Sequence, residues 1–495
     1  MNRPCSCGRF FSFFRGRMTG DKSLKYMLLT LALTLTCTLV GSLPLSGADG
    51  GGRKARGRVL RVALVGDPQV DDSTEMGYAR RSVYRELYGR RDLDMCIFLG
   101  DMVNDNMSLL PESVGVVDSL PYQCFMVPGN HDRDVYRGPK SSTYRRRDLS
   151  TWRKVVGYVD TSFVRGNVRF IMMNNVRHAS AGMTDYEGGF TEKQKHWLDS
   201  VLVSGVARSG KTSRGSVTPA LTILATHIPF SQMKGRDSVL ARIPEQVRML
   251  YVSGHTHFVS RDDSIPEVIA GATCGSWWRG VKDSDGVPYA LQSCGAPRGY
   301  FVAEIRRDGD YTLRYRCVGR DDEVSVWGVR VYDGGAVRAK GGVVEGDGGV
   351  YRLYVNVFGG APDGVVNVRG ARRWRIVSCS NETDMHDGSD SPDAFMGSPR
   401  KKRHLICERS AKTAPEVEQV IEFNASMSRD YRKSHRNEFI PLRRKPSTHL
   451  WQTTCLISSP LPVYVNVVYR DSHMRFRQRV PVMRDYPSKP KPGMD

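Results

Sequence analysis

Residues 63–71 read ALVGDPQVD, an apolar run that ends at a glycine and continues into a carboxylate and a neutral amide. The Val, Leu and Ala side chains favour a buried β-strand. Gly66 marks the end of this strand, because glycine accepts the backbone conformations of a sharp turn. Asp67 and Gln69 therefore stand directly after a strand, where side chains at the edge of a sheet meet ligands.

Four further apolar runs end on polar side chains in the same way. DMCIFLGDMVND leads to Asp101 and Asp105, CFMVPGNHD to Asn130 and His131, ATHIP to His227, and YVSGHTH to His255 and His257. For each motif alone, a helix cap, a turn residue or a hydrogen-bonded histidine is a sufficient explanation. Five such motifs, each after an apolar run, instead predict one shared site.

The spacing of the apolar residues predicts a layered α/β domain. Strands are expected at 59–66, 94–99, 122–127, 168–173, 221–226 and 248–253. Helical spacing is found at 74–88 and at 191–203, and Thr191 is the expected N-cap of the second helix. Strands that alternate with helices form α/β layers, and ligands bind beyond the carboxyl ends of the strands.

Carboxylates and imidazoles that converge at such an edge are the ligands that a pair of divalent metal ions requires. Carboxylates supply negative charge and can bridge two ions, while imidazoles suit borderline metals. We therefore expect two divalent ions, with Mn, Fe, Zn, Ni and Co as the candidates. The excess of basic residues suits anionic partners such as phosphate esters.

The order D-x-[HQ], GD-x-V-x-D, GNH[DE], a lone His and GH-x-H resembles the calcineurin-like metallophosphoesterase superfamily over about residues 60–260. This resemblance implies a four-layer α/β/β/α sandwich that holds two metals and hydrolyses phosphate mono- or diesters by attack of a metal-bridging hydroxide. It also implies the ligand sets: Asp67, Gln69, Asp101 and His257 for the first metal, and Asp101, Asn130, His227 and His255 for the second. Asp101 would bridge the two ions.

The resemblance places His131 near the substrate, so that His131 and Asn130 are the expected substrate-binding residues. His131 is the expected general acid, with Asp105 orienting it. The family most often has His where this chain has Gln69. The amide offers a carbonyl oxygen, a neutral and harder ligand, so the first metal site is the one whose affinity the sequence leaves open.

The texture of the sequence changes near Tyr300, from where Gly and Asp separate runs such as YFVAEI and YRLYVNVF. These runs predict antiparallel strands. We therefore expect a phosphoesterase domain over 59–300 and a β-rich domain over 301–495, with a polar insertion at about 380–436. The stretches 275–278 (GSWW), 295–300 (GAPRGY) and 449–451 (HLW) resemble a bacterial, Bacteroidetes-type subgroup with such a C-terminal domain. Trp277 and Trp278 are candidates both for a substrate cleft and for core packing.

The first 48 residues have the pattern of a secretory signal peptide. Basic residues precede an apolar run over 27–40, and Ser46-Gly47-Ala48 follows as a small-residue cleavage site. The run is shorter than the roughly 20 residues that span a bilayer, but a membrane anchor is the alternative. We expect an exported protein of the periplasm or cell envelope, with no stable transmembrane span in the mature chain.

The formal net charge of +21 suits anionic partners, although no nucleic-acid-binding module is recognisable. The cysteines have no C-x-x-C spacing outside the leader, which argues against a zinc ribbon. Export permits disulfides, and a pair between Cys274 and Cys294 is one candidate. The sequence also leaves open a protein of another class, one that keeps its metals, is catalytically weak and binds glycan or envelope.

Overall fold

The computed structural model describes residues 59–137, 144–178, 186–203, 219–262, 264–330, 337–339, 342–344, 349–370, 377–378, 405–457 and 463–484. The predicted signal peptide and residues 380–404 of the predicted insertion lie outside these ranges. From Gly57 onward the chain forms one compact unit. In the part that the structure describes, no helix combines the length and the apolar character needed to cross a bilayer.

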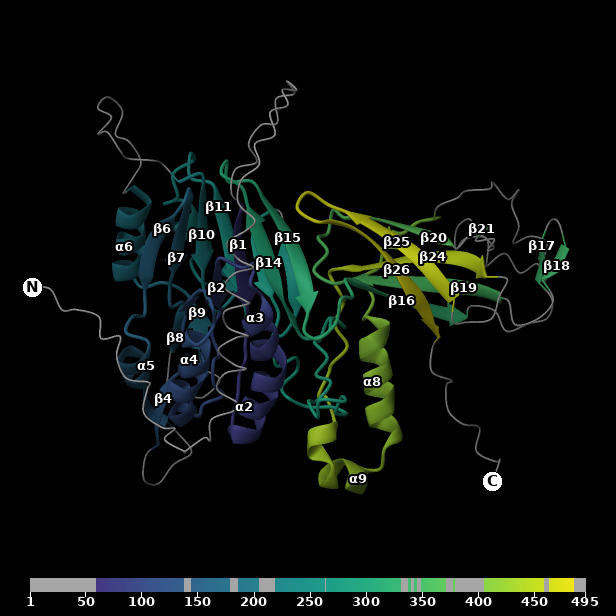
Figure 1. Ribbon diagram of the computed structural model, residues 1–495, viewed down its shortest axis with the longest axis horizontal. Coiled ribbons are helices and arrows are strands. Elements are labelled where there is room, and N and C mark those ends of the chain that lie inside the picture. Colours follow the sequence, from purple (N-terminus) through teal and green to yellow (C-terminus); the bar gives the residue numbers. More distant parts are fainter. Residues whose placement is uncertain are drawn as a thin grey trace, which may run out of the picture. The chain divides into compact units, whose positions relative to one another are not determined.

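The first sheet is built around the strand that the opening stretch predicts. Its five strands, labelled as in Figure 1, run in the order β15 (Tyr311–Cys317), β14 (Gly299–Ile305), β1 (Leu60–Val65), β2 (Met95–Phe98) and β3 (Gln123–Met126). β1, β2 and β3 are parallel, whereas β14 is antiparallel to β1. The ends of β1, β2 and β3 therefore meet at one edge of the sheet.

The second sheet has six strands. Their order is β12 (Val259–Asp262), β13 (Glu267–Ala270), β11 (Met249–Ser253), β10 (Leu221–Ala225), β7 (Val168–Met172) and β6 (Thr161–Arg165). β7, β10, β11 and β13 are parallel to one another, whereas β6 and β12 at the two ends are antiparallel, so β10 and β11 also end at a common edge. All six strands predicted from the sequence are present, within one or two residues of the expected bounds.

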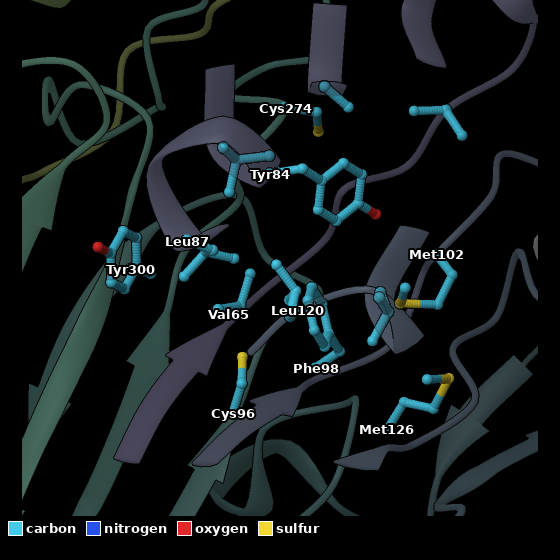
Figure 2. Packing of buried hydrophobic residues seen from close by; sticks show 14 of the residues in the cluster. Val65, Tyr84, Leu87, Cys96, Phe98, Met102, Leu120, Met126, Cys274 and Tyr300 are labelled. Atoms are coloured by element: carbon cyan, nitrogen blue, oxygen red, sulfur yellow. The ribbon is translucent and has the colours of Figure 1, made fainter. Parts of the chain in front are cut away.

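The two sheets pack face to face, and helices cover their outer faces. Val62 and Leu64 of β1 share a buried cluster with Phe170 of β7 and Ile223 of β10. The alternate β1 residues, such as Val65, point to the other side of the sheet. There Val65, together with Cys96 and Phe98 of β2, meets Tyr84 and Leu87 of the helical layer (Figure 2). β1 is thus apolar on both faces, which explains its unbroken run of hydrophobic residues. The predicted four-layer α/β/β/α sandwich is confirmed.

The helices of the sandwich follow the predicted spacing. α2 (Ser73–Ala79), a π-helical turn (Arg80–Tyr84) and α3 (Arg85–Gly89) form one continuous helical segment, capped by the Asp72 side chain. α4 (Leu110–Asp118) and α5 (Ser150–Val155) complete this layer. On the opposite face lie α6 (Glu192–Val203) and α7 (Arg236–Leu240). Thr191 Oγ1 accepts a hydrogen bond from the Gln194 N–H (3.2 Å), as predicted for an N-cap.

The C-terminal part contains a nine-stranded, barrel-like sheet with its own apolar core. Its path runs through β21 (Val377–Ser378), β24 (Leu450–Ile457), β19 (Gly349–Val357), β16 (Val324–Arg330), β26 (Arg475–Arg484), β25 (Val463–Arg470), β20 (Val365–Gly370) and β22 (Leu405–Ile406), with β23 (Glu408–Arg409) beside β24. Three two-stranded ribbons are β4–β5 (Asp134–Arg137, Tyr144–Asp148), β8–β9 (Val176–His178, Tyr186–Gly188) and β17–β18 (Val337–Ala339, Gly342–Val344).

The structure differs from the expected boundary at residue 300. β14 and β15 lie within the range assigned to the C-terminal domain, yet β14 pairs with β1 and β15 pairs with β14. They complete the first sheet, because without β14 the free edge of β1 would expose unpaired backbone N–H and C=O groups. The change of texture near Tyr300 therefore marks added strands of the sandwich and not the start of a separate fold.

The described part of the polar insertion predicted at about 380–436 contains α8 (Pro415–Ser426) and α9 (Arg429–Ser434), and α8 buries Val417 against Leu291. The candidate disulfide, in contrast, needs correction. Cys274 and Cys294 are both buried free thiols, so they do not form the candidate disulfide. Each fills a place in an apolar core, as free cysteine commonly does.

Candidate metal centre

The five polar motifs lie at the ends of β1, β2, β3, β10 and β11, at the edge where both sheets end. Nine side chains were expected there: Asp67, Gln69, Asp101, Asp105, Asn130, His131, His227, His255 and His257. The hydrogen bonds and ion pairs below join eight of them into one group, and the Gln69 backbone N–H donates to the Asp101 carbonyl (2.8 Å). The structure thus brings together all the predicted site residues; their roles as ligands and catalysts stay predictions.

The backbone at this edge is strained. Seven non-glycine residues of the described chain have a positive φ, and six of them belong to the predicted site: Asp67, Gln69, Asp101, Asp105, His255 and His257. This left-handed conformation is unfavourable for residues with a side chain. It persists where the surrounding structure imposes it, which is a property of functional sites.

Glycines in the motifs make room for the carboxylates. A Cβ atom on Gly129 would lie 2.0 Å from Asp101 Oδ1, and one on Gly254 would lie 2.4 Å from Asp67 Oδ2. Both distances are far below van der Waals contact. The glycines of the GNHD and GHTH motifs are therefore required by packing against side chains of the other motifs.

In the expected second site, three other donor atoms lie around His227 Nε2. Asn130 Oδ1 lies at 2.9 Å, His255 Nδ1 at 3.1 Å and Asp101 Oδ2 at 3.3 Å from this nitrogen. Asp101, His227 and His255 also present donor atoms that all lie within 4.8 Å of one another. Such a set of oxygen and nitrogen donors fits a borderline divalent cation.

The histidine rings are oriented as metal-ligating rings usually are. His227 Nδ1 is 2.8 Å from the Leu99 carbonyl oxygen, and His257 Nδ1 is 2.6 Å from that of Gly275. Each Nδ1–H donates to its carbonyl, so Nε2 is the ring nitrogen that binds a cation once it carries no proton. In both rings the backbone of a different segment fixes the tautomer.

The expected first site is formed by Asp67, Gln69 and His257. Asp67 is fully buried, and its carboxylate accepts the His255 backbone N–H at 3.0 Å. His257 Nε2 lies 3.9 Å from Asp67 Oδ1. The Gln69 amide nitrogen donates to Asn104 Oδ1 (3.3 Å), which leaves Gln69 Oε1 as the atom available for a cation.

The charges of the site favour an added cation. Burial raises the pKa of Asp67 well above its usual range, and the neighbouring Asp101 raises it further. Burial also opposes ionisation of Asp101, but the charges of His227 and His131 hold the pKa of Asp101 below its usual value. Burial opposes protonation of His227, yet Asp101 and Asp67 raise the pKa of His227 to about 9. Surroundings that stabilise positive charge in this way also stabilise a divalent ion.

His255 and His257 differ from His227 in their protonation. Burial lowers the pKa of His255 to about 3, and the positive charge of His227 adds to this effect. Burial likewise lowers the pKa of His257 to about 4. Both imidazoles are therefore neutral at pH 7, the form in which histidine binds metals.

His131 and Asp105 form the expected acid pair. His131 Nδ1 lies 3.1 Å from Asp105 Oδ1, and the His131 backbone N–H donates to Asp101 Oδ1 (2.9 Å). Burial opposes protonation of the ring, but Asp101 and Asp105 outweigh it and raise the pKa of His131 to about 9. The ring thus carries a proton at neutral pH, and the contact to Asp105 leaves Nε2–H as the group able to donate it.

Two residues that the sequence gave no reason to select lie against the site. Cys274 Sγ is 3.7 Å from Gln69 Oε1 and 3.8 Å from His257 Nδ1. The Tyr186 ring packs edge-on against His255, with 5.7 Å between ring centroids. Neither residue belongs to a strand-end motif, so only the folded chain shows that they line the centre.

The fold and the donor set define the class of protein: a four-layer α/β/β/α sandwich with a metal-binding edge. Residues 60–259 match the family described as calcineurin-like phosphoesterase, and residues 267–406 match the family described as the C terminal of calcineurin-like phosphoesterase. The two matches together cover more than half of the chain. Residues 60–259 are thus a calcineurin-like phosphoesterase domain, followed by the C-terminal domain of this family of metal-dependent hydrolases.

Other comparisons are less informative. No curated protein matches the sequence. Among solved structures, the NAD nucleotidase of Haemophilus influenzae is similar at 11% sequence identity and a TM-score of 0.28; the match covers 52% of this chain and 50% of that protein. The chain thus corresponds to about half the length of that structure.

Proposed function

We propose that the chain hydrolyses phosphate mono- or diesters with two divalent ions held at this edge. Asp67, Gln69, Asp101 and His257 would hold the first ion, and Asp101, Asn130, His227 and His255 the second. The observation that carries the proposal is the group of donors around His227 Nε2, all within 3.3 Å of it. Divalent ions bound there supply Lewis acidity toward the phosphoryl oxygens and lower the pKa of water.

The residues of the chain supply the remaining chemistry. His131 donates the proton of Nε2 to the leaving oxygen, whose developing negative charge needs to be neutralised. Asp105 holds the His131 ring from the other side through Nδ1 (3.1 Å) and stabilises its positive charge. Asn130 uses Oδ1 toward the metal side, which leaves its amide N–H groups to bind a phosphoryl oxygen.

Asp132 has a supporting role beside these residues. Its carboxylate accepts the backbone N–H groups of Val103 (3.0 Å) and Gly129 (2.9 Å). It thereby ties the loop after β2 to the loop after β3, and both loops carry predicted site residues. Each oxygen of this fully buried carboxylate accepts one of these hydrogen bonds, so Asp132 positions the loops and does not act on the substrate.

The test combines metal analysis with a substrate panel of p-nitrophenyl phosphate, bis-p-nitrophenyl phosphate, alkyl phosphates and nucleotides. Purified protein should hold about two divalent ions per chain and turn over at least one class of ester. His227→Ala should lose both metal and activity. His196→Ala is the matched control, because His196 is an exposed histidine on α6 (72% exposed).

The outcomes separate the alternatives. Preference for p-nitrophenyl phosphate identifies a monoesterase, and preference for the bis ester a diesterase. A protein that keeps two ions per chain and hydrolyses no ester would contradict the proposal. It would support instead the metal-retaining binding protein that the sequence leaves open.

A further inference from the structure

Among the residues that the structure describes, Trp277 is the one non-glycine residue with a positive φ that lies outside the predicted site. Its φ is 64°, and the other six such residues of the described chain are all predicted site residues. Large aromatic residues rarely adopt this conformation, because Cβ crowds the backbone. Glycine stands where positive φ is needed on both sides, at Gly275 (66°) and Gly280 (119°). Trp277 therefore occupies a backbone conformation that would suit glycine better.

Contacts of its neighbours impose this conformation. The Gly275 carbonyl accepts the His257 Nδ1–H at 2.6 Å. On the other side, Trp278 Nε1–H donates to the Pro68 carbonyl (2.9 Å), between Asp67 and Gln69. The segment is thus fixed to two of the motifs that form the expected first metal site, and Trp277 lies between the two anchoring residues, Gly275 and Trp278.

The two adjacent tryptophans have different surroundings. Trp278 is 3% exposed and packs against Tyr78, which accounts for it as a core residue. Trp277 is 39% exposed, and its ring centroid lies 6.0 Å from that of His257. The Arg279 guanidinium lies 5.4 Å from the centre of the Trp277 ring. The exposed part of this indole lies beside an expected metal ligand, so a substrate bound at the metal centre can contact it.

We propose that Trp277 is a specificity-determining residue that stacks against an aromatic ring in the organic group of the ester. This inference rests on the proposed function and narrows its substrate class to aryl or nucleoside phosphate esters. The indole supplies a flat apolar face next to the metal edge, and stacking on such a face suits any planar ring. The Arg279 guanidinium packs against the Trp277 ring and holds the indole in this position by a cation–π contact.

The first experiment measures binding to metal-loaded protein without turnover. Phenylphosphonate and methylphosphonate share the anionic group and differ in the ring, so the ratio of their dissociation constants reports the aromatic contact. We expect the wild type to prefer phenylphosphonate by on the order of 10- to 100-fold, the usual weight of one stacked ring. Trp277→Gly should abolish this preference, and Trp277→Tyr should retain most of it.

Trp277→Gly also separates binding from folding. Glycine accepts a positive φ, so the thermal midpoint of this variant should equal or exceed that of the wild type. Tyr464→Ala is the matched control, because Tyr464 is an exposed aromatic (48%) with the Arg479 guanidinium 4.9 Å from its ring centre. It lies on β25 of the C-terminal sheet, and its loss should leave the preference unchanged.

A second arm identifies the source of the ring and distinguishes the two proposals. Rates for AMP against ribose 5-phosphate report a nucleobase, and rates for phenyl phosphate against methyl phosphate report an aryl group. An equal loss of affinity for both phosphonates in Trp277→Gly, or no aromatic preference in the wild type, would overturn the inference. Absence of turnover on every ester, with the aromatic preference intact, would overturn the proposed hydrolysis and leave the ring-binding site standing.

Discussion

A buried ion pair between β12 and the turn after β25 gives a prediction whose size follows from the structure. Arg261 Nη1 lies 2.6 Å from Asp471 Oδ2, and the two side chains are 1% and 0% exposed. Arg261 stands four residues after His257, while Asp471 belongs to the C-terminal sheet region. Arg261→Met keeps most of the apolar stem but removes the charge that Asp471 faces.

The expected cost comes from the carboxylate that is left behind. Asp471 still accepts hydrogen bonds from the Tyr469 hydroxyl (2.6 Å) and from the backbone N–H groups of His473 (2.7 Å) and Met474 (2.6 Å). These donors do not neutralise its charge, and loss of one partner of a buried pair costs about 3–5 kcal/mol. For a unit that spans Gly57–Asp495, an unfolding entropy of about 2 cal/mol/K per residue makes 1 kcal/mol equal to about 1 °C.

Thermal unfolding followed by circular dichroism should therefore show a midpoint about 3–5 °C lower for Arg261→Met. Arg80→Met is the matched control, because Arg80 pairs with Glu112 (3.0 Å) at the surface, where the side chains are 50% and 45% exposed. An exposed pair is worth about 0–1 kcal/mol, so this control should shift by no more than about 1 °C. The double variant Arg261→Met with Asp471→Asn should recover most of the loss, because no buried charge remains.

The pH dependence supplies an independent check. Burial opposes ionisation of Asp471, but Arg261 and the Tyr469 hydroxyl hold the pKa of Asp471 below its usual value. A depressed pKa in the folded state stabilises the fold above the unfolded pKa of about 3.9 and is lost as the pH falls through the folded pKa. The difference between wild type and Arg261→Met should be largest near pH 7 and shrink below about pH 4. Equal shifts for Arg261→Met and Arg80→Met at pH 7 would refute the reasoning.

Three predictions concern the metal centre. His131→Ala should lower kcat for alkyl phosphates by about 10²–10⁴-fold and for p-nitrophenyl phosphate by less, because the better leaving group needs little protonation; steady-state kinetics at unchanged metal content test this, and equal losses on both esters would contradict the proton-donor role. Asp101→Asn should reduce the metal bound at both sites, because the negative charge of the bridging carboxylate offsets the repulsion between two close cations. Metal analysis after dialysis should find well under two ions per chain, and full retention of two ions would contradict the bridging role. Gln69→His should raise the chelator concentration needed to strip the first site, because imidazole is the better donor to borderline metals; an unchanged chelator titration would mean that Gln69 Oε1 is not a ligand.

Local sequence patterns were enough to predict the strands of the sandwich and to select the polar residues that gather at its edge. An apolar run such as 60–65 is local information, because a strand buried on both faces needs apolar side chains at every position. The polar residues after the strands are also local, since ligands stand where parallel strands end. For this reason Asp67, Asp101 and His227 could be selected together although they lie far apart along the chain.

The pairing of distant segments was decided only by the tertiary structure. β14 and β15 follow the metal motifs in sequence but complete the first sheet, because the open edge of β1 selects its partner by backbone hydrogen bonding and not by a sequence pattern. Cys274 reached Gln69 and His257 by the same long-range packing. Neither the pairing of β14 and β15 with the first sheet nor the contacts of Cys274 produce a periodic pattern in the sequence.

Trp277 and Trp278 show the same limit at the scale of one residue. Their types are identical and their positions adjacent, so composition and spacing cannot tell which one faces the centre. The Gly275 carbonyl and the Trp278 side chain both form hydrogen bonds with the metal motifs, and between these two residues Trp277 has a positive φ. This conformation leaves the Trp277 indole exposed and places the Trp278 indole in the core. The direction of a side chain in a loop depends on the backbone angles φ and ψ. Here two hydrogen bonds, to residues 18 and 210 positions away in the sequence, help to fix those angles.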